Sequence, residues 1–127
     1  IPFTNSAIAV NGNFLRDYPE IIEAVLKGLF EAQAFISAPA NRNAVIQTMM
    51  RHMKLSDPAV LEDGYQDLLI GLEKKPYVAA DGLRNIQRMM ATLNAKVLRS
   101  KVEDIIDNRF IRKLDDSGFI DSLYTKG

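Results

Sequence analysis

Few residues in this chain have the chemistry of a catalyst or a metal ligand. The 127 residues include one histidine, His52, and no cysteine. The absence of cysteine excludes disulfides, thiol catalysis and cysteine-ligated zinc. A single histidine without a second histidine or a cysteine matches no known metal-site spacing, and it excludes most nucleophilic triads. We therefore predict no metal site and interpret His52 as a residue on or near a helix surface.

The acidic residues and glycines do not form a catalytic pattern either. The carboxylate pairs Asp115–Asp116 and Asp104–Asp107 are sequence neighbours at predicted helix ends, where capping and solubility explain them better than acid–base catalysis. The seven glycines never cluster into a phosphate-binding loop, and no serine lies in a nucleophile-elbow pattern. We predict that the protein is not an enzyme and carries no cofactor.

Two groups of side chains offer binding chemistry instead. Arg84 and Arg88 lie one helical turn apart and could hold an anion, although a solvated helix face is the alternative. Met49, Met50 and Met53 lie on one predicted helix, either as adaptable core filler or as the lining of a binding groove. We interpret the arginines as part of a solvated helix face and the methionines as core filler.

The overall charge and hydropathy exclude two classes of partner or location. Lysine plus arginine and aspartate plus glutamate number 16 each, so the net charge is zero, which argues against nucleic acid as a partner because phosphates need a basic surface. No apolar run approaches the length of about 18 residues that a membrane-spanning helix needs. The chain begins at Ile1 rather than at methionine, which predicts a processed product or a piece of a longer chain.

A long central helix over residues 19–37 is predicted to organise the other elements. Pro19 suits the first helical position, where its missing N–H is not needed. The apolar face covers about half of the circumference, and Phe30 and Phe35 fall at its two margins. Its members are Ile21, Ile22, Val25, Leu26, Leu29, Ala32 and Ile36. A stripe of this width predicts packing against more than one neighbour.

The fold is predicted to be mainly α, with residues 1–127 forming a single helical unit. We expect roughly five to seven helices, including segments 42–54, 59–72, 80–94 and 102–107 and one that restarts near Arg109. A short strand over residues 6–10 is also predicted, although no partner strand is recognisable elsewhere. Ser100 and Glu103 fit a capping box, and Gly118 suits the end of a helix.

Two stretches carry a resemblance to a known family. The first comprises Ile1–Val10, read IPFTNSAIAV, and Asn13–Leu26, read NFLRDYPEIIEAVL. The second is Val102–Phe119, read VEDIIDNRFIRKLDDSGF, followed by Leu123 and Tyr124. Together they resemble the C-terminal part of periplasmic solute-binding proteins of ABC importers, in the nitrate, sulfonate, taurine and bicarbonate group.

The resemblance implies a fold and a function that extend beyond this chain. The family folds as two α/β lobes that close on a solute, so this chain would be a fragment supplying a hinge-crossing segment near 4–10 and helices that brace one lobe. The full-length protein would capture a small anionic or organic solute and deliver it to the ABC permease. It would be periplasmic, or lipid-anchored outside a Gram-positive cell.

Ligand contacts implied by the resemblance are confined to Thr4, Asn5 and Ser6, which lie where the family's chain passes near the cleft. Their side chains could hydrogen-bond an oxyanion, and structural capping is the alternative. The missing N-terminal lobe would leave apolar surface that favours self-association. The alternative function is a self-standing helical protein-interaction module, possibly dimeric.

Overall fold

The predicted mainly helical fold is confirmed by a computed structural model that describes residues 2, 4 and 6–125. This part of the chain contains seven α-helices and three short 3₁₀ helices. The α-helices are α1 (Gly12–Asp17), α2 (Pro19–Ser37), α3 (Arg42–Met53), α4 (Pro58–Gly71), α5 (Ala80–Ala91), α6 (Arg109–Asp116) and α7 (Phe119–Ser122). The 3₁₀ helices are η1 (Pro39–Asn41), η2 (Ala95–Arg99) and η3 (Val102–Ile105).

The short strand predicted over residues 6–10 is wrong. Residues 6–10 are extended but pair with no other segment, and the described residues contain no strand. A strand requires a neighbour to satisfy its backbone groups, and no described segment pairs with residues 6–10. Ile8 and Val10 consequently remain exposed to solvent.

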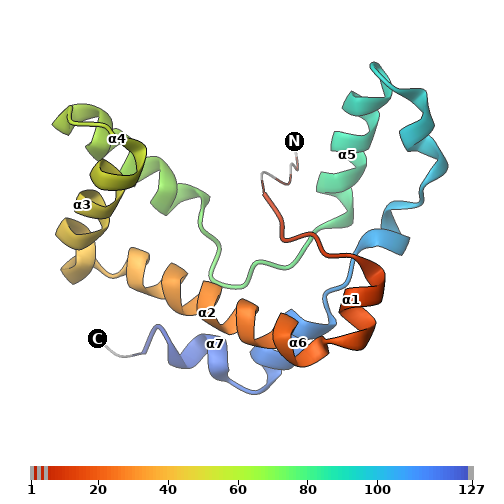
Figure 1. Cartoon of the computed structure of the whole chain (residues 1–127), viewed down its shortest axis with the longest axis horizontal. Coiled ribbons are helices and arrows are strands. Elements are labelled where there is room, and N and C mark those ends of the chain that lie inside the picture. Colours follow the sequence, from red (N-terminus) through yellow and green to blue (C-terminus); the bar gives the residue numbers. More distant parts are fainter. Residues whose placement is uncertain (1, 3, 5, 126–127) are drawn as a thin grey trace.

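The helices form an open arrangement around α2. Figure 1 shows α2 as the base, with α6 and α7 running along one side of it. The α3–α4 pair rises at the C-terminal end of α2, and α5 rises at the other side of the molecule. No helix of the described residues is both long and apolar enough to cross a membrane.

The main apolar core lies where α2 meets α6 and α7, a region named here the α2–α6 corner. Its buried members are Phe30, Ile111, Leu114 and Ile120, and Ile120 is fully buried. Partly buried apolar side chains surround them, namely Leu26, Tyr77, Phe119, Leu123 and Tyr124. Gly118 has a φ of 79°, a left-handed conformation that glycine adopts at little cost, and it turns the chain from α6 into α7.

The residues of α2 that are buried in the corner differ from those that the sequence predicted. Phe30, predicted at the margin of the apolar face, lies at the centre of the core and is only 3% exposed. Ile21, Val25 and Leu29, which were predicted to belong to that face, are exposed. Helical geometry fixes which residues share a face, but the neighbouring helices decide which part of the face is covered.

Helices α3 and α4 begin and end within one residue of the predicted segments 42–54 and 59–72. Asp57 caps α4 by accepting a hydrogen bond from the backbone N–H of Ala59 at 2.9 Å, and Pro58 is in the first turn. Tyr65 is buried, and its hydroxyl donates to the backbone carbonyl of Ile36 at 3.2 Å, which ties α4 to the end of α2.

The α5 arm, comprising α5, η2 and η3, packs mainly on itself. Only Gly82 and Val102 are buried in its helices. The predicted helix 80–94 ends earlier, at Ala91, and Leu93 is 93% exposed. The predicted helix 102–107 is a 3₁₀ helix over Val102–Ile105 that has no side-chain cap, so the capping box is wrong.

Candidate functional site

The ligand contacts predicted at Thr4, Asn5 and Ser6 do not form a binding site within the described residues. Thr4 is half-buried and Ser6 is exposed, and neither side chain makes a hydrogen bond within the described residues. Asn5 lies outside the described residues. Neither Thr4 nor Ser6 caps α1, because Asn11 does so by accepting a hydrogen bond from the backbone N–H of Asn13 at 2.9 Å.

The other candidates from the sequence are also surface or structural features. His52 is exposed on α3, and the described residues contain no cluster of three metal-ligating side chains. Arg84, considered for an anion, instead pairs with Asp81 at 2.6 Å and with Glu103. The methionines of α3 were predicted to fill the core, which is wrong for Met50 and Met53, because both are exposed. Met49 lies near Gly64 of α4.

A polar cluster supports the α2–α6 corner rather than a reaction. The Lys75 ammonium lies 2.6 Å from Asp115 Oδ1 and 3.1 Å from Asp121 Oδ2, and the Tyr77 hydroxyl donates to Asp115 Oδ2 at 2.7 Å. The Lys75 contact, followed by the Tyr77 hydrogen bond, lowers the pKa of Asp115 below its ordinary value of 3.8. A carboxylate held in its charged form by two donors is a structural anchor.

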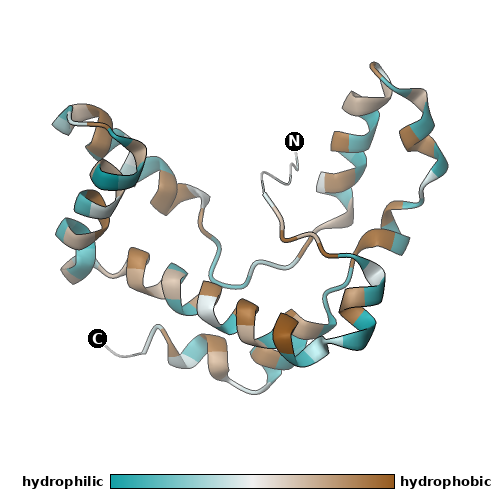
Figure 2. Ribbon diagram, in the orientation of Figure 1, coloured by the Kyte–Doolittle hydropathy of each residue, from teal (hydrophilic) through white to brown (hydrophobic). Residues whose placement is uncertain are grey.

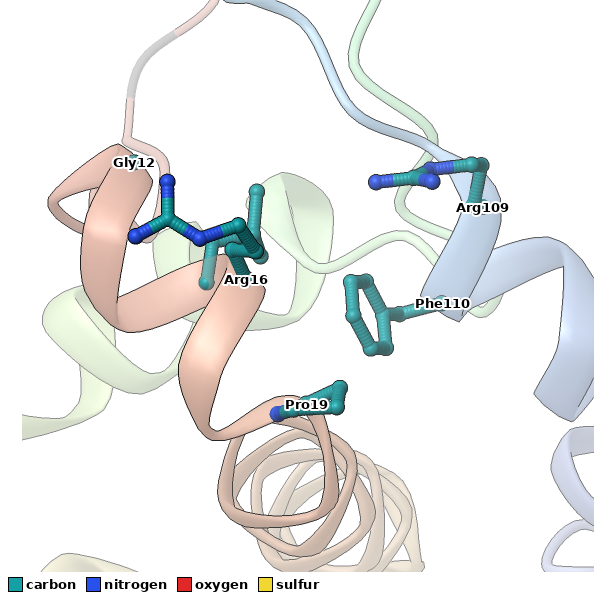
Figure 3. A pocket seen from close by; sticks show the side chains of 6 residues that line it. Gly12, Arg16, Pro19, Arg109 and Phe110 are labelled. Atoms are coloured by element: carbon teal, nitrogen blue, oxygen red, sulfur yellow. The ribbon is translucent and has the colours of Figure 1, made fainter.

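The hollow between α1 and the start of α6 is the candidate binding site. Two adjoining hollows, of about 610 and 570 Å³, share Gly12, Leu15 and Arg109 in their walls. Both hollows are open to solvent, so they are surface grooves rather than clefts that enclose a ligand. Figure 3 shows the Phe110 ring facing the α1 side above Pro19, while Arg109 extends from α6 toward α1 and Arg16 lies over α1.

The α6 wall of the hollow is fixed by amide and carboxylate contacts. Asn108 donates from Nδ2 to the carbonyl of Val78 at 3.0 Å and accepts from the Val78 N–H at 2.9 Å. Asp107 accepts from the Arg109 backbone N–H at 3.0 Å. The segment that precedes α6 is thereby held against the chain that leads into α5, and Arg109 begins the helix at a defined place.

Both arginines of the hollow are oriented by neighbouring carboxylates. Asp107 accepts from Arg109 Nε at 3.0 Å and from Nη2 at 2.7 Å, and Asp17 accepts from Arg16 Nε at 2.9 Å. The Arg109 guanidinium holds the pKa of Asp107 below its usual range. In each arginine the Nη1 group has no hydrogen-bond partner among the described residues, so its donors remain available to a ligand.

Sequence reasoning missed this hollow because its walls are distant in the chain. The only local signal is the segment Asp107–Arg109 followed by Phe110, which places a held guanidinium next to an aromatic ring. Nothing in the sequence indicates that Arg16, more than 90 positions earlier, lies across from it.

A second candidate surface is the uncovered apolar face of α2. Ile21, Val25, Leu29 and Phe35 are exposed on this helix, and the space beside Gly28 is open outside the helix's own backbone. Figure 2 shows apolar residues recurring along α2, α4 and α5. Large apolar side chains on one uncovered helix face are typical of an interaction surface.

The total exposed area leads to the same conclusion. The chain exposes 9358 Å², whereas a compact monomer of 14.2 kDa exposes about 6,800 Å². The excess, roughly 2,600 Å², is at the upper end of what one side of an obligate interface buries. The open arrangement of the helices therefore leaves more surface uncovered than a compact chain of this mass does.

Comparisons with known proteins do not assign the chain to a family. No protein-family model, curated protein or solved structure matches it.

Proposed function

We propose that this chain is the C-terminal helical part of a solute-binding component of an ABC importer. In this role it is not an enzyme; the full-length periplasmic or lipid-anchored protein captures a small anionic or organic solute and delivers it to the permease. The proposal is motivated by the resemblance of segments 1–26 and 102–124. The observation that carries it is the uncovered apolar surface, because a helical part that braces an α/β lobe must have a face for that lobe.

The α2 face has the composition expected for such a contact. Ala24, Gly28 and Ala32 lie at i,i+4 spacing beside the exposed Val25 and Leu29, and the stripe contains no charged residue. Small side chains let a neighbouring backbone approach closely, and charged residues are depleted from interface cores. The charged residues Glu20, Glu23, Lys27 and Glu31 lie on a different side of the helix.

The absence of cysteine from this chain allows a direct test. In the isolated chain, Val25→Cys should react rapidly with a thiol reagent because Val25 is 49% exposed. In the full product of the reading frame, its reaction should slow at least tenfold if a lobe covers α2. Glu31→Cys, on the polar side of the same helix, is the matched control and should react at similar rates in both. Any native cysteines in the longer product are first replaced by serine.

Two results would overturn the importer role. One is a reading frame that encodes no lobe-forming α/β sequence before Ile1. The other is equal reactivity of Val25→Cys in the isolated chain and in the full product, with Glu31→Cys also unchanged.

The second candidate is a self-standing helical interaction module that forms a dimer. It is favoured by the same uncharged stripe, because an apolar face with small residues at its centre is complementary to a second copy of itself. Sedimentation of the isolated chain separates the two candidates. The module predicts a single dimeric species that Val25→Glu converts to a folded monomer, whereas an importer part predicts no defined dimer.

A further inference from the structure

The charges of this neutral chain are divided unevenly between the α3–α4 pair and the α5 arm. Residues 42–73, which contain the pair, include three basic and five acidic residues, whereas residues 80–105 of the arm include five basic and three acidic residues. The two lysines that follow residue 73 contact Tyr124 and Asp115 of the C-terminal segment instead. The pair is therefore net acidic, and the arm is net basic by the same amount.

The outward face of α4 places two carboxylates between two apolar side chains. This α4 outer face comprises, at helical spacing, the exposed residues Val60, Asp63, Asp67 and Ile70. It lies opposite the buried Leu61 and Tyr65, and Ile70 is 83% exposed. Neither aspartate has an ion-pair partner among the described residues, and like charges one helical turn apart repel each other. The face is therefore suited to a partner that brings cations and apolar side chains together.

The tip of the α5 arm has the complementary composition. Residues 85–102 contain no acidic residue, and Arg88, Lys96 and Arg99 are exposed without an ion-pair partner among the described residues. These cations and the exposed apolar side chains beside them form the α5 tip. Its apolar members are Met89, Met90, Leu93 and Leu98. The tip therefore matches the α4 outer face in charge and in apolar character.

The other charged residues of the two regions leave this match unchanged. Glu62 pairs with Arg42, and Arg84 pairs with both Asp81 and Glu103. The remaining three basic and three acidic residues offset one another within their own regions. They are Arg51, Lys54, Asp57 and Glu73 in the first region and Lys101 and Asp104 in the second.

We propose that the α4 outer face docks on the α5 tip of a second copy of this chain, and that the contact is reciprocal. Figure 1 shows the α3–α4 pair and the α5 arm rising from the same side of α2, at opposite sides of the molecule. One two-fold rotation therefore places α4 of each copy beside the α5 arm of the other, so that both contacts form together.

A second copy satisfies both patches, whereas an anionic membrane surface satisfies only one. Such a surface would attract the α5 tip but repel the α4 outer face of the same molecule. A standard interface buries about 800 Å² on each partner, so each of two reciprocal patches needs to bury only about 400 Å². The contact does not use the α2 face and does not depend on the importer role.

Sedimentation at two ionic strengths tests the proposal. Exposed ion pairs are weak and are screened by salt, so we expect a dimer with a dissociation constant of roughly 100 µM at about 20 mM sodium chloride. At about 0.5 M sodium chloride the constant should rise about tenfold or more. Val25→Glu should leave the low-salt dimer unchanged. Sedimentation at the higher salt therefore reports on the α2 face alone, and the failure of this contact is distinguishable from failure of the importer role.

Charge reversal tests the reciprocal geometry. The acidic-face variant is Asp63→Lys/Asp67→Lys, and the basic-tip variant is Arg88→Glu/Arg99→Glu. Each variant alone should associate about tenfold more weakly at low salt, because like charges meet in both contacts. An equimolar mixture should regain the parent affinity, since one contact then joins the two reversed patches and the other joins the two native patches.

The matched control is Glu31→Lys/Asp116→Lys. It changes the net charge as much as the acidic-face variant does, but at exposed positions outside both patches, and it should retain the dimer. Circular dichroism verifies that each variant remains folded. Where a reversal prevents folding, Asp67→Asn and Arg88→Gln replace it, and each should weaken association about threefold.

The proposal fails on any of four results. These are no association at low salt, unchanged affinity in either reversal variant, a mixture that does not regain association, or loss of the low-salt dimer in Val25→Glu. Two other occupants would also contradict it. Binding of the monomer to phosphatidylglycerol vesicles without self-association would assign the α5 tip to a lipid surface, and faster sedimentation of the monomer at low salt would show that the patches meet within one copy.

Discussion

The α2–α6 corner and the α5 arm are both built from amphipathic helices, yet only the corner has a closed core. In the corner, Phe30, Ile111, Leu114 and Ile120 bury one another. In the arm, the apolar side chains Met89, Met90, Leu93 and Leu98 remain exposed. The difference shows that an apolar stripe is sufficient to predict a helix. Burial of that stripe requires a second apolar surface from another part of the chain.

The contacts that position the arm are correspondingly polar. Gln87 Nε2 donates to the carbonyls of Val97 and Ser100, both at 2.7 Å, and Asn108 ties Val78 to the start of α6. Hydrogen bonds of this kind fix geometry but contribute less stability than a buried aromatic side chain. The corner should therefore determine the global stability, and the arm should open locally.

The largest expected effect tests the corner directly. Phe30→Ala should lower the free energy of unfolding by about 3–5 kcal/mol, because it removes a buried aromatic side chain and leaves a cavity. Urea denaturation measures the change. Leu93→Ala in the arm is the control and should alter stability by less than about 0.5 kcal/mol. Similar losses in the two variants would remove the distinction between corner and arm.

The next effect tests the junction between the two regions. Asn108→Ala leaves the N–H and carbonyl of Val78 without their side-chain partner, and an unpaired, partly buried backbone group costs about 1–3 kcal/mol. Hydrogen exchange should accelerate in α5 and η2 more than at Leu114. The exposed Asn43→Ala on α3 serves as a control, and uniform acceleration throughout the chain would show that the arm is not an independent unit.

A smaller effect tests the turn that closes the corner. Gly118→Ala places a Cβ on a residue with φ 79° and should destabilise the protein by about 1–2 kcal/mol. Gly28→Ala is a control of opposite sign, because this helical glycine has open space around it and alanine favours the helix by about 1 kcal/mol. Chemical denaturation of both variants measures the difference, and equal changes would contradict the assigned role of Gly118.

The smallest effect concerns the charged anchor of the corner. Contact with Lys75 and then with Tyr77 keeps the folded-state pKa of Asp115 below its ordinary value. The contact therefore stabilises the fold fully above the unfolded-state pKa of about 4, and this contribution is lost as pH falls through the lower folded pKa. Comparison of urea midpoints at pH 7 and pH 3 should show a smaller decrease for Asp115→Asn than for the parent chain. An identical decrease would mean that Asp115 does not contribute to acid sensitivity.

The sequence predicted helix starts well where the signal is local. Pro19 and Gly118 each act within one turn of their own position, and the structure confirms their roles. The apolar spacing at 80–94 predicted a helix that extends too far, because Leu93 has no surface to pack against.

The features that failed were those that depend on distant parts of the chain. The strand over 6–10 required a partner that the described residues do not supply. The central position of Phe30 depends on Ile111 and Ile120, and the hollow depends on α1 lying opposite Arg109. Helical periodicity does not predict these tertiary contacts, because it fixes only the side of the helix on which a residue lies.

The distance along the chain between the members of the corner has a consequence for folding kinetics. Phe30 meets Ile111 across about 80 intervening residues, so closing this contact loses more chain entropy than pairing neighbouring helices such as α3 and α4. The α3–α4 pair and the turns of α5 can form from local contacts alone. We expect refolding to begin in these segments and the corner to close last, which makes Phe30 a position where substitution accelerates unfolding more than it slows refolding.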